Sequence, residues 1–518
     1  MATAPLVNIK DLSITVNGEV LFERLSFAVE PGEMVALIGP NGCGKSTILN
    51  HVYAQVGSDA ELVDNIAFEI EGSVFLSPHI SVGYLPQVLQ SGSVSDDLSR
   101  GFESFGGADY ERLCRDFDVI GGSDDTRVSG GELQKRFLAR VLAADSDLYL
   151  LDEPTNYMDL AGITALEYYC ENFKSRGKGL IVVTHDRAFT DNLADRTILV
   201  TSHRILGVAG GATAAWSAWS GDFESRSHRA KEIDKKIKQL QKDVIAKAGW
   251  AAASEKRKIG AGSSKPYLGK LSKKIAMRAK AVRRRAEREI GRLEEVKPFV
   301  AKKVSLHFPD YEVRNRDVFS LRDVRFDYRD EADGGETRYL LRDVDIAIRA
   351  RDRLCLMGKN GSGKSTLLKL LLGQLRPKRG EAYRNASVKV VGIPQGLTGF
   401  FKRERLLDNF DDCGFDETTI RQYLGSVLIR RDEVEKSLDS FSQGELMRAA
   451  VVKGVLSRAE FLLLDEPTSH LDIESIDVLE QLLRGFAGGY LVISHDRSFA
   501  ASIASKLYML DDGSLDLV

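Results

Sequence analysis

Short apolar runs along the chain predict an α/β architecture. Met34-Val-Ala-Leu-Ile38 and Arg353-Leu-Cys-Leu-Met357 each end at a glycine, which is typical of a buried parallel strand that leads into a phosphate-binding loop. The residues after Lys45 and Lys364 read as helices. Further buried strands are expected at 148–151, 180–183, 461–464 and 491–493.

The middle of the chain has a different, helical pattern. Apolar residues at spacings of three and four form two stripes, Ile233, Ile237, Leu240 and Val244, and then Leu271, Ile275, Val282, Ala286, Ile290 and Leu293. The breaker cluster Gly260-Ala-Gly-Ser-Ser-Lys-Pro266 separates them. The pattern predicts two antiparallel helices, and arms of roughly 25 residues would extend about 35 to 40 Å.

The chain repeats itself once, in four blocks that keep their order. Gly39–Thr47 returns as 358–366, Ser129-Gly-Gly-Glu-Leu as Ser442-Gln-Gly-Glu-Leu, Leu151-Asp-Glu-Pro-Thr as Leu464-Asp-Glu-Pro-Thr, and Thr184-His-Asp-Arg as Ser494-His-Asp-Arg. Repetition of this kind indicates a duplicated domain. We expect a first domain at residues 1–221, a helical linker at 222–304 and a second domain at 305–518.

Composition limits the setting in which these domains work. The 518 residues contain no run of about 18 apolar residues and no basic start followed by an apolar stretch, so a cytoplasmic protein is expected. The five cysteines form no CxxC pair, which argues against a zinc site, an iron-sulfur cluster or a disulfide framework. From Arg226 to Lys303, 25 Lys and Arg stand against 8 Asp and Glu, although the whole chain has a net charge of -3.

The first repeated block is a phosphate-binding loop, GxxxxGK[ST], in which glycines let backbone N–H groups converge on an anion. Lys45 and Lys364 are expected to reach the β and γ oxygens of a nucleotide, and Ser46 and Ser365 to ligate Mg²⁺. One match alone can be coincidental, but two between a strand and a helix are not. Cys43 is interpreted as a small neutral loop residue. The nucleotide contacts are assigned to Gly39, Asn41, Gly42, Gly44, Thr47, Gly358, Asn360, Gly361, Gly363 and Thr366 as well.

Paired acidic residues close a strand in each half. Asp152 and Asp465 suit a Mg²⁺ position, and the carboxylates that follow them, Glu153 and Glu466, suit the orientation or deprotonation of an attacking water. A solvent-exposed acidic strand end is the alternative. The identical Leu-Asp-Glu-Pro-Thr strings at matching positions outweigh it.

The second repeated block indicates which class of P-loop protein the two domains resemble. Alone, Ser129-Gly130-Gly131 would be a helix N-cap and turn. At 23 positions before the Asp-Glu strand in both halves, it and Ser442-Gln443-Gly444 resemble the signature motif of the ABC ATPases. The resemblance covers nearly the whole chain outside the basic segment. It implies that each signature contacts the nucleotide of the opposite domain, so Ser129 and Gly131 would serve the Lys364 site, and Ser442 and Gly444 the Lys45 site.

Other residues take their roles from the same resemblance. Gln87 and Gln395 resemble the Q-loop glutamines near Mg²⁺ and the water, and His185 and His495 resemble the switch histidines that contact the γ-phosphate. Asp159 and Asp472 match the D-loop aspartate that crosses the domain interface. Tyr328 stands where the family places an aromatic residue that stacks on adenine.

The halves also differ from each other. The stretch of the first half that corresponds to Tyr328, Ile14-Thr-Val16, contains no aromatic residue. The second signature carries Gln443 where glycine is usual, and the first D-loop region reads Asn156-Tyr-Met-Asp159 instead of the commoner Asn-His-Leu-Asp. We therefore expect two unequal ATP sites.

The basic linker predicts a nucleic-acid partner. Arg283-Arg-Arg285 can pair with phosphates, and Trp250 and Tyr267 can stack on unpaired bases, a combination that favours RNA over a merely solvated face. Tandem ABC domains joined by a charged helical linker resemble the ABC-F proteins. That resemblance implies a monomer that binds the ribosome, its rRNA and tRNA, and sends its linker toward the peptidyl-tRNA and the peptidyl transferase centre.

Two kinds of function are known in that family, antibiotic protection and general relief of stalled ribosomes. Gln87 and Ser129 lie 42 positions apart, which leaves little room for the inserted arm of some members and favours the protective kind. The ATPase subunit of an importer is a rival, although such subunits lack a long basic hairpin. DNA repair is a second rival, against which the missing zinc cysteines count.

Overall fold

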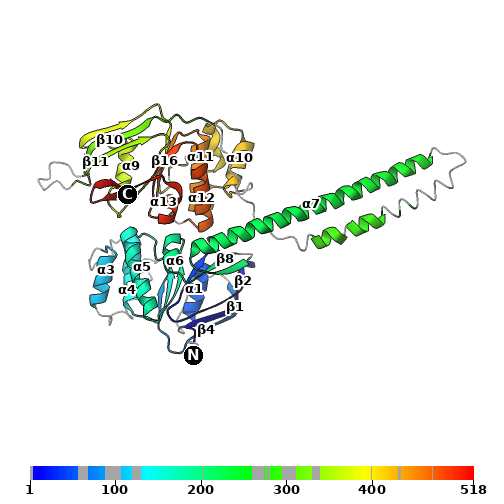
Figure 1. Ribbon diagram of the computed structural model, residues 1–518, viewed down its shortest axis with the longest axis horizontal. Helices are drawn as coiled ribbons and strands as arrows, with labels where there is room; N and C mark the ends of the chain where they lie inside the picture. The colour runs from blue at the N-terminus through cyan, green and yellow to red at the C-terminus, as the bar shows by residue number, and fades with distance from the viewer. Residues whose placement is uncertain are drawn as a thin grey trace. The chain divides into compact units, whose positions relative to one another are not determined.

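The structure is a computed structural model. It describes residues 4–56, 68–87, 107–119, 130–201, 204–259, 274, 277, 280–286, 288–293, 311–328, 339–397, 399–429, 433–469 and 471–518. The statements below concern these residues. Their helices and strands form two α/β domains and the helix that leaves the first of them (Figure 1).

The first domain combines a six-stranded sheet with a small antiparallel sheet. The six strands run in the order β5-β6-β7-β3-β8-β9, and all neighbours are parallel except β8 and β9. The antiparallel sheet has the order β2-β1-β4. The elements are β1 (Val7–Val16), β2 (Glu19–Val29), β3 (Met34–Ile38), α1 (Lys45–Ala54), β4 (Phe68–Leu76), β5 (Val82–Leu85), α3 (Gly107–Asp116), α4 (Gly130–Ala143), β6 (Leu148–Asp152), α5 (Leu160–Ser175), β7 (Gly179–Val183), α6 (Arg187–Leu193), β8 (Arg196–Thr201) and β9 (Arg204–Ala209).

The second domain repeats this arrangement. Its large sheet has the order β14-β15-β16-β12-β17-β18, and its small sheet the order β11-β10-β13. The elements are β10 (Asp317–Phe326), β11 (Leu341–Arg349), β12 (Arg353–Gly358), α9 (Lys364–Leu371), β13 (Arg379–Arg384), β14 (Val390–Ile393), η3 (Leu407–Cys413), α10 (Glu417–Ser426), η4 (Leu438–Ser440), α11 (Gln443–Leu456), β15 (Phe461–Asp465), α12 (Ile473–Gly485), β16 (Gly489–Ile493), α13 (Arg497–Ile503), β17 (Lys506–Asp511) and β18 (Ser514–Leu517). The predicted α/β fold and its duplication are confirmed.

The central strands of each large sheet are buried on both faces, which explains their continuous apolar runs. Leu148 and Leu150 of β6 pack in the cluster beneath the antiparallel sheet, together with Ile48 of α1. Tyr149 and Leu151, which point to the other face, pack in a second cluster with residues of α4 and α5. The four further strands expected from the sequence are β6, β7, β15 and β16. The sheet therefore gives the loop after β3 and the acidic end of β6 a rigid base.

The linker helix is longer than the sequence pattern suggested. Helix α7 (Ala212–Ile259) has 48 residues, which corresponds to about 70 Å of helix and not to an arm of roughly 25 residues. It begins within the first unit, Met1–Ala215 with Val304–Val518, and continues into a second compact unit, Trp216–Lys303. The apolar stripe underestimated the helix because alanine-rich residues outside the stripe also favour helix.

Within the second unit, the predicted stripes contain the residues that are buried. Ile233 and Ile237 on α7 are buried, as is Ala286 in the helical residues 280–286. Leu271, Ile275 and the predicted turn at 260–266 lie outside the described residues, as does Tyr267, and the side chain of Trp250 is not described. In the part of the chain that the structure describes, no helix has the length and apolar character needed to cross a membrane.

Candidate ATP sites

Each phosphate loop follows the central strand of its sheet and folds tightly around its lysine. Lys45 donates from Nζ to the carbonyl oxygens of Gly39 at 2.8 Å and Pro40 at 2.9 Å. Lys364 donates in the same way to Gly358 at 2.8 Å and Lys359 at 2.7 Å. Both ammonium groups are thus positioned inside the loop, next to the amides that would receive a phosphate.

The first glycine of each loop is required by a close backbone approach. A Cβ on Gly39 would lie 2.1 Å from the carbonyl oxygen of Val200 in β8, and one on Gly358 would lie 2.2 Å from that of Leu510 in β17. Both glycines have φ values of 151°, in the region that side chains rarely adopt. The loops begin where the neighbouring strand leaves no space for a side chain.

The acidic strand ends meet the requirements of a Mg²⁺ site. Asp152 is fully buried, and neither of its carboxylate oxygens has a hydrogen-bond partner among the described residues. Burial raises the pKa of Asp152 to about 6, against the opposing influence of Ser46 and Lys45 beside it. A buried carboxylate without partners suits an incoming cation. With Ser46, it would hold a Mg²⁺ ion, and Asp465 with Ser365 would do so in the second domain.

A glutamate and a histidine form a close pair in each site. Oε1 of Glu153 lies 3.3 Å from Nε2 of His185, and Oε1 of Glu466 lies 3.2 Å from Nε2 of His495. Glu153 and Glu466 have φ values of 50° and 47°, an unusual conformation for residues other than glycine. Backbone strain of this kind is concentrated at functional sites.

Burial sets the charge state of these pairs. It raises the pKa of Glu153 to about 8 and that of Glu466 to about 7, while the nearby Lys45 and Lys364 oppose the shift. It lowers the pKa of His185 to about 3 and that of His495 to about 4. At neutral pH both imidazoles are therefore neutral, and each glutamate can take up or release a proton near neutrality, as a general base must.

The D-loop aspartates connect the two domains. Asp159 accepts a hydrogen bond from the Gly162 amide at the start of α5 and another, at 3.2 Å, from the amide of Asn360 in the second phosphate loop. Asp472 caps α12 through Ser475 and accepts a bond of 3.1 Å from the amide of Asn41 in the first loop. Each domain thus holds the phosphate loop of the other.

Many of the predicted site residues share one cavity of 1110 Å³. It is lined by residues of both domains, and those predicted from the sequence are Asn41, Gly42, Gln87, Gly131, Glu153, His185, Tyr328, Asn360, Gly361, Gly363, Lys364, Ser365, Thr366, Gln395, Asp465, Glu466 and His495. Gly39, Gly44, Lys45, Ser46, Thr47, Gly130, Asp152, Gly358 and the second signature do not line it. The cavity is large enough for a nucleotide. Gly131 of the first signature lines it together with residues of the second phosphate loop.

The two signatures are described to different extents. Ser442 is the N-cap of α11 and forms a capping box with Glu445, so the helix begins at Gln443. The backbone of α4 begins at Gly130, and Ser129 lies outside the described residues. A Cβ on Gly131 would lie 2.9 Å from Cβ of Tyr157, and one on Gly444 would lie 2.9 Å from Leu471. Glycine at these positions therefore allows each signature helix to pack against its own D-loop.

The expected difference at the adenine position is visible in the backbone. Tyr328 follows β10, is 58% exposed, and shares a hydrogen bond of 3.0 Å with Thr366 of the second phosphate loop. In the first domain Ile14 of β1 pairs with Phe22 of β2, and in the second Phe326 of β10 pairs with Leu341 of β11. Ile14 and Phe326 are therefore equivalent. Two residues further on, Val16 occupies the place of Tyr328. The first site thus has an aliphatic residue where the second offers an aromatic ring.

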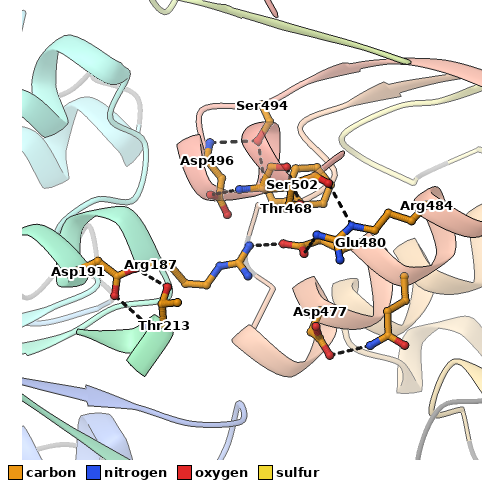
Figure 2. Close-up of polar contacts among 12 residues, drawn as sticks. Arg187, Asp191, Thr213, Thr468, Asp477, Glu480, Arg484, Ser494, Asp496 and Ser502 are labelled. Atoms are coloured by element: carbon orange, nitrogen blue, oxygen red, sulfur yellow. Dashed lines mark hydrogen bonds and ion pairs between the residues drawn. The ribbon is translucent and has the colours of Figure 1, made fainter. Parts of the chain in front are cut away.

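Two ion pairs between the domains were not predicted from the sequence. Arg187, which begins α6, contacts Glu480 of α12, and Arg497, which begins α13, contacts Glu167 of α5 (Figure 2 shows the first pair). Glu480 also pairs with Arg484 at 3.0 Å. The sequence did mark the arginines, since each belongs to the repeated His-Asp-Arg string. The glutamate of each pair, however, lies on a surface helix that carries no motif.

Together, the fold and these contacts define a P-loop ATPase whose two sites are completed across a domain interface. The profile of the ABC transporter family matches residues 22–156 and 341–469, just over half of the chain. The chain therefore belongs to the ABC transporter family and carries two of its ATP-binding domains. It is an ATPase that uses ATP with Mg²⁺.

Similar proteins agree with this assignment. An ATP-binding protein Uup of Caulobacter vibrioides is 27% identical over 98% of this chain and 78% of its own length. ABC transporter F family member 5 of Arabidopsis thaliana is 26% identical over 98% of this chain and 75% of its own. These relatives confirm the resemblance to the ABC-F proteins.

Among solved structures, the fold is shared with an archaeal ribosome recycling factor, aABCE1, seen in complex with the ribosomal stalk protein aP1. The two chains superpose with a TM-score of 0.58 at 20% identity, over 95% of this chain and 85% of that one. An RNase-L inhibitor matches with the same TM-score over 97% and 87%. Both likenesses concern the fold.

Proposed function

We propose that this chain is a cytoplasmic, monomeric ABC-F ATPase that binds the ribosome when ATP closes its two domains. The linker would then point toward the peptidyl-tRNA and the peptidyl transferase centre and protect the ribosome from antibiotics that act there. The observation that carries the proposal is the long basic helix between the two ATPase domains. Hydrolysis through Glu153 and Glu466 would reopen the domains and release the ribosome.

The exposed charges of the linker support an RNA partner. Lys231, Lys235, Lys236, Lys238 and Lys242 are exposed on α7, on the side away from the buried Ile233 and Ile237. Lysines in this arrangement can neutralise backbone phosphates and release their counterions, which gives affinity that falls steeply with salt. Arg283, Arg284 and Arg285 are exposed as well.

The start of α7 supports coupling between ATP and the linker. Helix α6 begins two residues after His185, and its residues Thr190 and Asp191 hold the first turn of α7. Thr190 accepts a hydrogen bond of 3.2 Å from the Ala212 amide. Asp191 accepts one of 2.9 Å from the Thr213 amide and a second from the Thr213 hydroxyl (Figure 2). A short rigid helix thus connects the γ-phosphate sensor with the linker helix.

Comparison with the duplicated domain supports this role of the anchor. The residues of α13 that correspond to Thr190 and Asp191 are Ala500 and Ala501, which cannot accept side-chain hydrogen bonds. Helix α13 leads into β17 as α6 leads into β8, so the two helices hold equivalent places in their domains. The polar pair therefore occurs only in the domain that carries the linker.

Sedimentation with purified ribosomes tests the proposal. The Glu153→Gln, Glu466→Gln variant, which keeps ATP unhydrolysed, is expected to sediment with ribosomes in ATP and not in ADP. A matched variant with Arg283, Arg284 and Arg285 changed to Glu should lose this binding but still bind ATP. Translation inhibited by drugs of the peptidyl transferase centre would then be measured with and without the protein.

Each outcome separates one function from another. Binding in ATP together with restored translation supports protection. Binding without restored translation would replace protection by a general role on stalled ribosomes. If neither nucleotide state sedimented with ribosomes, the ribosomal proposal would be wrong, and co-purification with membrane subunits would favour the importer.

A further inference from the structure

The residue six positions after each signature serine is basic, but the two halves use it differently. These residues are Lys135 on α4 and Arg448 on α11. Equivalent positions in a duplicated chain face equivalent surroundings unless their side chains diverge. The contacts of Lys135 and Arg448 show such a divergence.

Lys135 is a poorly exposed cation that opens into the cavity. Its residue is 9% exposed, and no described residue pairs with its ammonium at hydrogen-bond or ion-pair distance. It lines the 1110 Å³ cavity together with Gly131, Asn360 and Lys364. An ammonium that opens into a cavity without a carboxylate at ion-pair distance can take a phosphate as its counter-charge.

The electrostatic surroundings place Lys135 at the second site. Its charge acts on His495: burial and the charge of Lys364 lower the pKa of that imidazole, and Lys135 adds to the effect. It also acts on Asp159, where burial favours the neutral acid, but bonds from the Gly162 and Asn360 amides and the charge of Lys135 keep the pKa low. Asp159 is held by the second phosphate loop through that Asn360 bond.

Arg448 is committed to its own domain. Its Nε donates to the carbonyl oxygen of Val427 at 2.9 Å, and its Nη1 donates to the hydroxyl of Ser475. It is buried and does not line the cavity. The guanidinium therefore ties α11 to the end of α10 and to α12.

We propose that Lys135 binds the phosphates of the ATP held by Lys364, supplied from the opposite domain, and that the first site has no equivalent cation. Binding of ATP would give the buried ammonium its counter-charge, so part of the interaction exists only when the domains are closed on nucleotide. The second site would thereby hold ATP more tightly than the first. The proposal concerns the ATPase itself and does not depend on the ribosome.

The release of trapped nucleotide tests this directly. The Glu153→Gln, Glu466→Gln protein is expected to trap two ATP molecules per chain and to release them in two phases, with the slower phase from the second site. Adding Lys135→Gln should speed the slower phase roughly 10- to 100-fold, the loss of one hydrogen bond to a charged group, and leave the faster phase unchanged. Photolabelling with 8-azido-ATP at intervals during release, followed by peptide mapping, should assign the slower phase to the second domain.

Two matched variants separate phosphate binding from a structural role. Lys135→Arg keeps the charge and should restore the slow phase. Lys178→Gln removes another poorly exposed lysine of the first domain, one that donates to the carbonyl oxygens of Asp145 and Ser146 outside the cavity, and should leave both phases unchanged. An unchanged slow phase in the Lys135→Gln protein would overturn the proposal, as would equal acceleration of both phases or failure of arginine to rescue.

Discussion

The anchor between α6 and α7 gives the most direct test of how nucleotide could move the linker. In Asp191→Ala, the Thr213 amide loses its acceptor and the Thr213 hydroxyl loses the carboxylate to which it donates. A side-chain cap of a helix is worth about 1 kcal/mol. A hydrogen bond from a hydroxyl group to a charged carboxylate contributes about 1.5 kcal/mol, part of which is offset when the freed hydroxyl bonds to water. We expect a loss of about 2 kcal/mol in the local stability of the first turn of α7.

Native-state hydrogen exchange measures this quantity residue by residue. A loss of about 2 kcal/mol corresponds to roughly a 30-fold larger opening constant, so the Thr213 amide should exchange about 30 times faster in the variant. The amides in the centre of β3 should keep their rates. Asp191→Asn retains an acceptor for the Thr213 amide and should show a smaller increase, and this graded response identifies the cap as the cause.

The result that would refute the reasoning is an exchange rate for Thr213 within about threefold of the original protein, since that is less than 1 kcal/mol. In that case the first turn of α7 would be held by other contacts. The close approach of Gly211 to α6 gives a second test, because a Cβ on Gly211 would lie 2.3 Å from Oδ1 and 2.4 Å from Cα of Asp191. Gly211→Ala should therefore also speed the exchange of Thr213, by displacing Asp191 instead of removing it.

Three further predictions concern the ATP sites and the domain interface. Burial raises the pKa of Glu153 from 4.5 to about 8, so ionisation of this carboxyl group lowers the stability of the folded protein as the pH rises through this range. Glu153→Gln should therefore raise the melting temperature at pH 9 but not at pH 5. Equal gains at the two pH values would contradict this. Tyr328→Ala should weaken ATP binding at the second site by about 5- to 30-fold in titrations, because the ring no longer stacks on adenine. Val16→Tyr should strengthen ATP binding at the first site. Unchanged affinities in both variants would exclude stacking. Arg187→Met leaves the buried Glu480 with Arg484 as its remaining partner among the described residues and should cost about 2 kcal/mol in thermal unfolding, much of it recovered when Glu480→Met is added; a double variant no more stable than the single one would count against the pair.

The architecture could be read from the sequence because each domain is built on strands buried on both faces. Their apolar runs are distinct from the alternating strands β1 and β10, whose burial alternates along much of their length. The glycines of the phosphate loops were equally clear, since the contact between Gly39 and Val200 admits no side chain. Local constraints of this kind leave a direct signal in the chain.

Contacts between the domains left a weaker signal. Glu480 and Glu167 lie on amphipathic helices whose charged residues look like ordinary surface positions until the other domain covers them. Lys135 and Arg448 look interchangeable in the sequence, and only their partners distinguish them. The length of α7 was underestimated for a related reason, because helix propensity continues where the apolar stripe ends.

Comparison of equivalent positions shows how the duplicated domains have divided their work. The second site combines Tyr328 at the expected adenine position with Lys135 of the first domain, which lines the same cavity, and we expect both to favour retention of nucleotide. The first site lacks both, but its His185 is followed by the helix that holds the start of the linker through Asp191. A site that binds ATP less tightly changes its occupancy more readily, and that is the property required of the site that signals. We therefore expect hydrolysis at the first site to release the linker while the second keeps the domains together.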